Sequence, residues 1–192
     1  MSPVSLHLAS ASPRRSDILK SLGLTFTCGG VAVNEDRLRG EAADAMVLRL
    51  ARAKAGAVPR KRSQLVLGAD TAVVLGNDVF GKPRDRDDAL EMLARLSGRT
   101  HSVLTGIALC AAQDLRSALS VTEVRFREIR PDEALAYWQS GEPCDKAGAY
   151  AIQGRGGVFV ESIAGSYSGV VGLPVFETVQ LLHDAGLRVL ND

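Results

Sequence analysis

The stretch Leu65-Val-Leu-Gly-Ala-Asp-Thr-Ala-Val-Val-Leu75 decides the fold, because it is apolar along its whole length except at its centre. Such a run, rich in Val, is typical of a buried strand. The sequence Gly76-Asn-Asp78 follows it and predicts a tight turn. An ionised carboxylate at Asp70 costs free energy unless it is paired, binds a metal ion or lies at the open end of the strand. We therefore expect a central strand that carries one functional or structural carboxylate.

Helices and strands alternate on both sides of this strand. Further strands are predicted at Val4–Ala9, His101–Ala112, Ser117–Arg127 and Val158–Val160, with an extended segment near Phe26. Amphipathic periodicity with Pro or Gly at the ends predicts helices over 13–22, 42–58, 85–96, 131–140 and 173–184, Ser12 serving as the cap of the first. A hairpin near Gln113-Asp114 and helical crossovers together predict an α/β fold with a mixed sheet, and residues 142–157 are predicted as a Gly-rich loop.

Composition excludes several classes of protein. The length of 192 residues suits one domain or two small lobes that share a core. A net charge of +1 argues against a basic nucleic-acid binder or a protein drawn to anionic membranes, and no apolar run reaches the roughly 18–20 residues that span a bilayer. Three cysteines form neither a CxxC pair nor a disulfide framework, and the N-terminus lacks the pattern of a secretory signal. We therefore expect a cytoplasmic protein with no nucleic-acid or membrane partner.

Three familiar motifs are nearly matched, and each fails at a particular residue. Gly76–Lys82 fits GxxxxGK, but Pro83 stands where a phosphate loop needs Ser or Thr. Gly165–Gly169 resembles a nucleophile elbow, but its central residue is Tyr167. The histidines are too scattered to predict a zinc site; they are His7, His101 and His183.

Several charged residues lie at predicted buried positions or at helix ends, where they are candidates for a functional site. Several cations that converge with one or two carboxylates suit phosphoryl chemistry, because the cations neutralise phosphate oxygens while a carboxylate holds a divalent ion or deprotonates water. The candidates are Arg14, Arg15, Lys54, Lys82 and Lys146 with Asp70.

Each candidate also has a structural alternative. Asp70 could cap a neighbouring backbone segment, and Lys54 could extend its ammonium to solvent from the edge of its helix. Arg14 and Arg15 are ordinary solvated residues when taken alone. Glu35 would by default be a loop residue, and Gln153 a turn residue bonded to its own loop. Physical reasoning from the residues leaves the phosphate site and these alternatives open, and it names no substrate.

Six blocks of the sequence occur in order between residues 6 and 186. They are Ser10-Ala-Ser-Pro-Arg-Arg15, Gly68-Ala-Asp-Thr71, Gly81-Lys-Pro83, Ser97-Gly-x-x-His-x-Val-x-Thr105, Gly141-Glu-Pro-x-Asp-Lys-Ala-Gly-Ala-Tyr-x-Ile-Gln-Gly154 and Gly165-Ser-Tyr-x-x-Val-Val-Gly-Leu-Pro174. Together they resemble the Maf family of nucleoside triphosphate pyrophosphatases. The long form of the fifth block and Thr71 after Asp70 are similar to the subgroup that acts on dTTP and UTP, rather than the one that prefers 7-methyl-GTP.

The resemblance implies a reaction and a fold. The reaction is hydrolysis of a nucleoside triphosphate between the α and β phosphates, with dTTP and UTP, and also modified pyrimidine nucleotides, as substrates. The fold is a single domain over residues 1–192, an elongated mixed sheet flanked by helices that forms two lobes around a cleft, similar to the inosine-triphosphatase (Maf/Ham1-type) architecture. Two alternatives stay open: a nucleotide-binding regulator of cell division and septum formation whose hydrolysis is incidental, and an inosine-triphosphatase-type purine enzyme. A homodimer is also left open.

The resemblance also assigns roles to residues. It implies that Asp70 accepts the proton of the attacking water and shares a divalent cation, Mg²⁺ or Mn²⁺, with Glu35. The positions that shape base specificity are Arg14, Thr71 and Gln153. The phosphate-binding positions are Ser10, Arg15, Lys54, Lys82 and Lys146. One departure is Ala151, where many relatives have Gly; its extra methyl group could narrow the base pocket.

Overall fold

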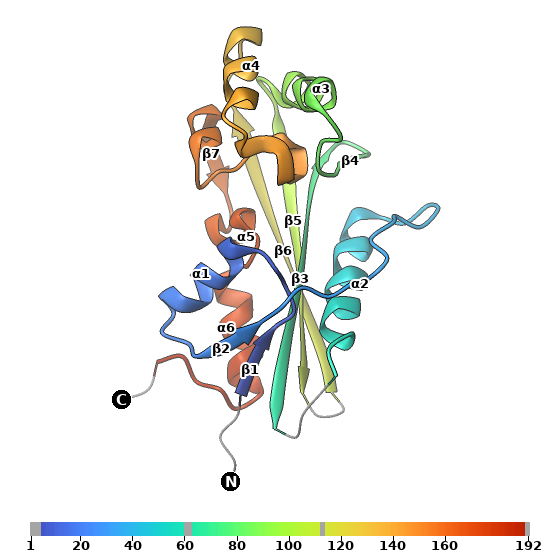
Figure 1. Ribbon diagram of the computed structural model, residues 1–192, viewed down its shortest axis with the longest axis vertical. Coiled ribbons are helices and arrows are strands. Elements are labelled where there is room, and N and C mark those ends of the chain that lie inside the picture. The colour runs from blue at the N-terminus through green and yellow to red at the C-terminus, as the bar shows by residue number, and fades with distance from the viewer. Residues whose placement is uncertain (1–4, 60–62, 112–113, 191–192) are drawn as a thin grey trace. The chain divides into compact units, whose positions relative to one another are not determined.

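The structure, a computed structural model, describes residues 5–59, 63–111 and 114–190 (Figure 1). Seven strands of this part of the chain form one sheet in the order β2-β1-β3-β5-β6-β7, and β4 pairs with β3. The strands are β1 Ser5–Leu8, β2 Phe26–Cys28, β3 Gln64–Leu75, β4 Asp78–Phe80, β5 Thr100–Ala111, β6 Asp114–Phe126 and β7 Val160–Ala164. β1 runs parallel to β2 and β3, whereas β4 is antiparallel to β3 and β7 to β6. The predicted mixed sheet is therefore confirmed.

The apolar stretch quoted first is the strand β3, which pairs with β1 through Leu6 opposite Leu65. β3 turns at Gly76, which has a positive φ of 62°, and continues as β4 with Val74 opposite Val79. Glycine adopts this left-handed conformation without steric cost. The segment that mimics a phosphate loop is thus a hairpin, as its Asn77-Asp78 turn indicates.

Contacts divide the chain into two compact units. Unit 1 consists of Met1–Asp70, Thr105–Ser120 and Gly172–Asp192, and unit 2 of Thr71–Leu104 and Val121–Val171. Asp70, the last residue of β3 in unit 1, is followed directly by Thr71, the first residue of unit 2. The expected single domain with a cleft between two lobes stays a prediction.

In unit 1, helices cover both faces of the strands (Figure 1). One face carries alternate residues of β3 such as Leu65 and Leu67, which pack against α1 (Pro13–Ser21) and α6 (Val175–Asp184). The opposite face packs against α2 (Ala43–Gly56). Gly68 lets α2 approach closely, because a Cβ there would lie 2.3 Å from the carbonyl oxygen of Ala51. This close approach brings the side chains of α2 beside β3.

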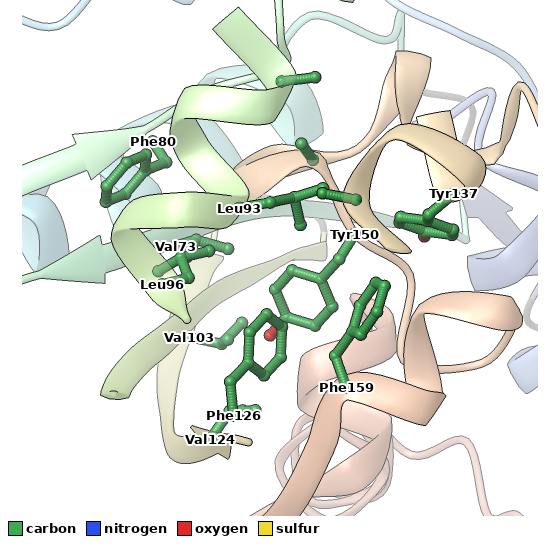
Figure 2. Close-up of a cluster of buried hydrophobic side chains, with 13 residues drawn as sticks. Val73, Phe80, Leu93, Leu96, Val103, Val124, Phe126, Tyr137, Tyr150 and Phe159 are labelled. Carbon is green, nitrogen blue, oxygen red and sulfur yellow. The ribbon is translucent and has the colours of Figure 1, made fainter. Parts of the chain in front are cut away.

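Unit 2 has its own core, in which aromatic rings pack in edge-to-face pairs (Figure 2). The ring of Phe126 lies 4.7 Å from Tyr150, and Tyr137 lies 5.2 Å from Phe159, centroid to centroid. Two helices, α3 (Arg86–Leu96) and α4 (Pro131–Gln139), supply further apolar residues. His101 is buried and bonds the Tyr150 hydroxyl through Nε2 at 2.9 Å; burial lowers the pKa of its imidazole to about 4. His101 is a core residue in this arrangement.

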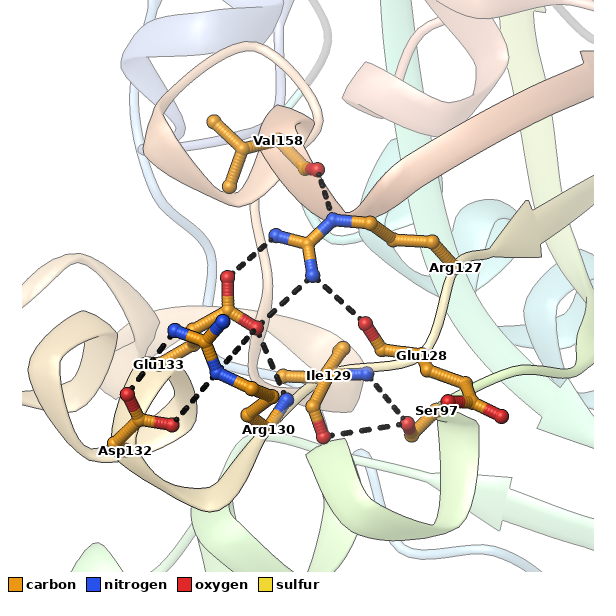
Figure 3. A network of polar contacts seen from close by, with 8 residues as sticks. All are labelled: Ser97, Arg127, Glu128, Ile129, Arg130, Asp132, Glu133 and Val158. Atoms are coloured by element: carbon orange, nitrogen blue, oxygen red, sulfur yellow. Dashed lines mark hydrogen bonds and ion pairs between the residues drawn. The ribbon is translucent and has the colours of Figure 1, made fainter.

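A polar network fastens the segments around α4 (Figure 3). Arg127 donates two hydrogen bonds to the Glu133 carboxylate, at 2.9 and 3.0 Å, and a third to the carbonyl of Val158 at 3.0 Å. Ser97, which follows α3, bonds both the N–H and the carbonyl of Ile129. The network therefore ties the segment after β6 to the residues that precede β7.

Several predicted boundaries are wrong, and tertiary contacts explain why. The strand predicted at Val158–Val160 begins only at Val160, because Phe159 belongs to a 3₁₀ turn, η3 (Arg155–Phe159), and packs into the unit 2 core. Residues 142–157, predicted as loop, contain two further turns, η1 (Glu142–Asp145) and η2 (Ala147–Ala149). The last helix begins at Val175 because Pro174 is extended, and a short helix, α5 (Tyr167–Val171), was not predicted.

Ser12 does precede α1, but its side chain makes no capping hydrogen bond. The predicted strand residues Val4 and Ala112, and the turn residue Gln113, lie outside the described residues. Among the described residues, no helix has the length and apolar character that a membrane crossing requires.

Candidate functional site

An ion triad in unit 1 forms the centre of the candidate site. Lys54 of α2 places its Nζ 2.7 Å from Oδ1 of Asp70 on β3 and 2.5 Å from Oε1 of Glu35 in the segment before α2. The Lys54 and Asp70 side chains are only 11% and 13% exposed, whereas Glu35 is 55% exposed. Two carboxylates from different segments thus converge on one half-buried ammonium. Lys54 does not simply extend into solvent.

The environment of Asp70 makes it a better base than an ordinary aspartate. Burial raises the pKa of its carboxyl and the negative charge of Glu35 raises it further, while the positive charges of Lys54 and Arg15 lower it; the net shift is upward. A carboxylate with a raised pKa binds a proton more strongly, which is the property that a general base needs. The alternative of a carboxylate that caps backbone N–H groups would predict the opposite shift.

Arg15 is fixed beside this triad by two contacts. Its Nε donates to the carbonyl of Gly172 at 2.8 Å, and its Nη1 donates to Oγ of Ser10 at 3.3 Å. Burial lowers the pKa of its guanidinium, the nearby Asp70 raises it and the neighbouring Arg14 lowers it again, with a net lowering. The sequence block that begins at Ser10 therefore places a half-buried cation close enough to Asp70 for the two charges to interact.

The segment that carries Glu35 is tied to α2 by a second ion pair. Glu41 accepts hydrogen bonds from Arg49 at 2.6 and 2.8 Å and from the backbone N–H of Leu38 at 3.1 Å. Arg49 also donates to the carbonyl of Asp36 at 3.0 Å. The hydrogen bond from Arg49 is the main reason that the pKa of Glu41 falls to about 2. The residue next to Glu35 is thus held by the helix that carries Lys54.

Four predicted site residues belong to unit 2. Thr71 is half-buried on β3, and Lys82 is exposed after β4. The segment of Lys82 is joined to the Gly-rich segment, because Gly148 donates its N–H to the carbonyl of Gly81 at 3.0 Å. Lys146, also in the Gly-rich segment, forms an ion pair with the adjacent Asp145 and is 12% exposed. Unit 2 thus brings the backbone segments of Lys82 and Lys146 together.

Gln153, the fourth, lies in an exposed turn between η2 and η3. Within the part of the chain that the structure describes, its side chain makes no hydrogen bond, so it does not bond its own loop as the structural alternative expects. Glu142 and Tyr137 hold the turn instead: Glu142 accepts from the N–H of Arg155 and of Gly156, each at 3.0 Å.

Sequence reasoning missed the residues that hold the site in place. Glu41, Arg49, Glu142 and Tyr137 were given no role, and neither was the carbonyl of Gly172. The one available signal was the quoted block that begins Gly141-Glu-Pro, in which an acidic residue opens a Gly-rich segment. Backbone carbonyls carry no such signal, because every residue has one.

The donor set can be tested against the expected divalent metal. Within the described ranges, no group of three or more His, Cys, Asp and Glu side chains gathers as an ion site. Mg²⁺ is commonly held by one or two carboxylates together with substrate phosphates and water. Glu35 and Asp70, which meet at Lys54, fit that pattern with a triphosphate as the remaining source of oxygen ligands.

Comparisons with known proteins identify the family of this chain. A family model described as "Maf-like protein" matches residues 5–185. A dTTP/UTP pyrophosphatase of Hahella chejuensis is 50% identical over 191 residues, which cover 97% of this chain and 95% of that protein. A dTTP/UTP pyrophosphatase of Methylococcus capsulatus is 52% identical over 184 residues, which cover 95% of this chain and 91% of that protein.

A further relative of the same description, from Escherichia coli O157:H7, is 49% identical over 182 residues, which cover 94% of this chain and 92% of that protein. Among solved structures, a nucleoside-triphosphatase / dITP/XTP pyrophosphatase from Mycobacterium abscessus is 15% identical, covering 65% of this chain and 75% of that one with a TM-score of 0.42.

Proposed function

Because this chain belongs to the Maf family, we propose that it is a nucleoside triphosphate pyrophosphatase that hydrolyses dTTP and UTP to the monophosphate and pyrophosphate. The relatives of about half identity over nearly the whole chain support the substrates. The observation that carries the chemistry is the half-buried contact between Lys54 and Asp70, with Glu35 beside it. A protein that only bound nucleotides would not need a carboxylate of raised pKa among cations.

In the proposed mechanism Asp70 accepts a proton from the water that attacks the α-phosphorus. The raised pKa of its carboxyl supports this role, since it brings the base closer to the operating pH. Lys54 orients the carboxylate through its 2.7 Å contact. The electron pair of the broken α–β bond stays on pyrophosphate, and the proton on Asp70 is then released to solvent.

Cations would hold the phosphates during this step. Arg15 is suited to it because Gly172 and Ser10 fix its guanidinium, and a fixed cation loses little entropy when it binds an anion. The family's motifs support the same role for Lys82 and Lys146. Glu35 and Asp70 would hold a divalent cation, which supplies charge neutralisation and a lower pKa of bound water.

Base selectivity is proposed to depend on Arg14, Thr71 and Gln153. Gln153 supports this best, because its exposed amide offers both an N–H donor and an oxygen acceptor. Such a pair can match the O4 and N3–H edge of thymine or uracil, whereas cytosine presents the opposite pattern. An unpaired buried polar group costs about 1–3 kcal/mol, enough for roughly ten- to hundredfold discrimination.

A panel of natural and modified triphosphates with pyrophosphate detection tests the proposed function. We expect dTTP and UTP to have the highest kcat/KM, with CTP and the purine triphosphates well behind. Gln153→Ala should reduce the preference for UTP over CTP more than it reduces turnover of the poorest substrate. Equal hydrolysis of CTP and UTP by the wild type would contradict the base selectivity, and leading purine substrates would favour the inosine-triphosphatase alternative.

We also propose that the enzyme acts in the cytoplasm without a nucleic-acid or membrane partner. The near-neutral net charge and the absence of a disulfide framework in the sequence support this. Cell fractionation with an antibody against the chain tests the location.

A further inference from the structure

We infer that Tyr137 and Glu142 are positioning residues that hold the backbone on both sides of Gln153 and thereby set the selectivity between uracil and cytosine nucleotides. This inference rests on the proposed function, in which Gln153 contacts the base. Tyr137 and Glu142 act through Gln153 and need not touch the substrate.

The backbone before Gln153 is held by Tyr137. The N–H of Ala151, two residues upstream, donates to the Tyr137 hydroxyl oxygen at 3.0 Å. The same hydroxyl donates its proton to Oε1 of Glu142 at 2.7 Å. Tyr137 is 5% exposed, and its ring packs edge to face on Phe159 in the unit 2 core (Figure 2). The upstream anchor is therefore fixed by the core itself.

The backbone after Gln153 is held by Glu142. The two N–H groups of Arg155 and Gly156, each 3.0 Å away, donate to Oε2 and Oε1 of its carboxylate. Burial raises the pKa of the Glu142 carboxyl, but the hydrogen bonds from Tyr137 and from these two N–H groups outweigh it, and the net pKa is lowered. One ionised carboxylate thus accepts three hydrogen bonds and joins both anchors.

Gly154 lets the turn lie directly on this carboxylate. A Cβ at Gly154 would be 2.3 Å from Oε2 of Glu142, and one at Gly156 would be 2.6 Å from the Tyr137 hydroxyl oxygen. Any larger residue at either place would push the turn away. The backbone around Gln153 is thus bound closely on one side, while the Gln153 side chain is exposed.

This combination of a held backbone and an exposed side chain suits an amide that recognises a base. Hydrogen-bond donors and acceptors that recognise a ligand must be held within ~0.5 Å of the required place, by groups other than the ligand. In the described part of the chain Gln153 has no side-chain hydrogen bond of its own, so the place from which its amide reaches a base is set by the backbone that Tyr137 and Glu142 hold.

The test uses Tyr137→Phe, which keeps the ring and removes the hydroxyl, and Glu142→Gln, which keeps the shape and removes the charge. The quantity measured is the ratio of kcat/KM for UTP to that for CTP. This ratio does not depend on the fraction of enzyme that is folded, so partial unfolding of a variant cannot imitate the effect. We expect both variants to lower the ratio by about tenfold, mainly through a higher KM for UTP.

A double-mutant cycle separates positioning from a general effect. In the Gln153→Ala background, Tyr137→Phe and Glu142→Gln should leave the ratio unchanged, because no amide remains to be positioned. Glu161→Gln on β7 makes the same charge change as Glu142→Gln, at an exposed ion pair with Arg125 of β6. It is the matched control and should leave the ratio unchanged in every background.

Two negative results have different meanings. A wild type that does not prefer UTP to CTP overturns the proposed base selectivity, and the inference with it. A preference that Gln153→Ala removes, but that both Tyr137→Phe and Glu142→Gln retain, overturns the positioning role alone. A further fall of the ratio in the Gln153→Ala background also overturns it.

Discussion

At the scale of the residue, Asp70 combines two opposing influences. Burial destabilises its charged form, and the contact with Lys54 at 2.7 Å stabilises it. Neither influence alone would suit a base: a fully solvated carboxylate is too weak, and an unpaired buried one would be protonated. The balance leaves a carboxyl group whose pKa lies above the ordinary value of an aspartate.

Replacement of this residue gives the first prediction at this scale. Asp70→Asn is nearly isosteric and can still hydrogen-bond, but it cannot accept a proton, so we expect kcat to fall by about 10²–10⁴-fold. Circular dichroism and thermal melting should show a folded protein, which excludes unfolding as the cause. A folded variant with kcat within threefold of the wild type would show that Asp70 is not the base.

At the scale of the element, the ion pair between Glu41 and Arg49 helps to hold the segment between β2 and α2, beside the pair of Glu35 with Lys54. Glu41 joins the backbone of this segment to Arg49 of α2, and Arg49 reaches the carbonyl of Asp36, next to Glu35. The segment has no regular secondary structure between residues 29 and 42, so side-chain contacts must supply the bonds that a helix or strand would make internally.

Glu41→Gln should therefore lower Tm in a pH-dependent way. The folded pKa of Glu41 is depressed to about 2, below its ordinary value of 4.5, so its ion pair stabilises the folded state above pH 4.5 and loses this effect as the pH falls toward 2. Melting curves should show a Tm difference between wild type and variant that is full at pH 7 and vanishes near pH 2. A difference that stays constant with pH would contradict this, as would an equal effect of the control Glu128→Gln.

At the scale of the whole molecule, the two units each carry a core and a part of the predicted site. Unit 1 holds the ion triad and Arg15, and unit 2 holds Lys82, Lys146 and the Gln153 turn. The described residues of unit 1 offer two carboxylates at one place and no third ligand side chain. Any divalent ion there would take its remaining oxygen ligands from the substrate and from water.

This arrangement predicts a metal requirement that involves Glu35. Chelation with EDTA should abolish hydrolysis, and added Mg²⁺ or Mn²⁺ should restore it. Glu35→Gln should raise the metal concentration for half-maximal activity, whereas Asp36→Asn, the same charge change one residue on, should not. Calorimetry of Mg²⁺ binding to the enzyme with pyrophosphate gives a readout apart from turnover. Full activity in excess chelator would remove Glu35 and Asp70 as metal ligands.

The sequence by itself determined the local elements and the family. Periodicity and Pro or Gly punctuation located α2, α3, α4 and β3 to within two residues, because these signals depend on neighbours a few positions apart. The sequence also excluded a phosphate loop at Gly76–Lys82. Pro83 and the turn at Asn77-Asp78 gave the reason, and both signals depend only on neighbouring residues. The charged residue Asp70, which interrupts an apolar run, also marked the centre of the candidate site.

Only the tertiary structure decided how distant segments meet. Lys54 and Asp70 are 16 residues apart, and Arg15 contacts a carbonyl 157 residues away. Val158 and Phe159 have the residue types of a strand, yet packing of Phe159 against Tyr137 holds them in a 3₁₀ turn. Glu142 lies in a segment predicted as a loop, and only the structure shows that its carboxylate accepts hydrogen bonds from the backbone N–H groups of Arg155 and Gly156. Such contacts depend on how elements pack, and packing is a property of the folded chain that no short window of residues contains.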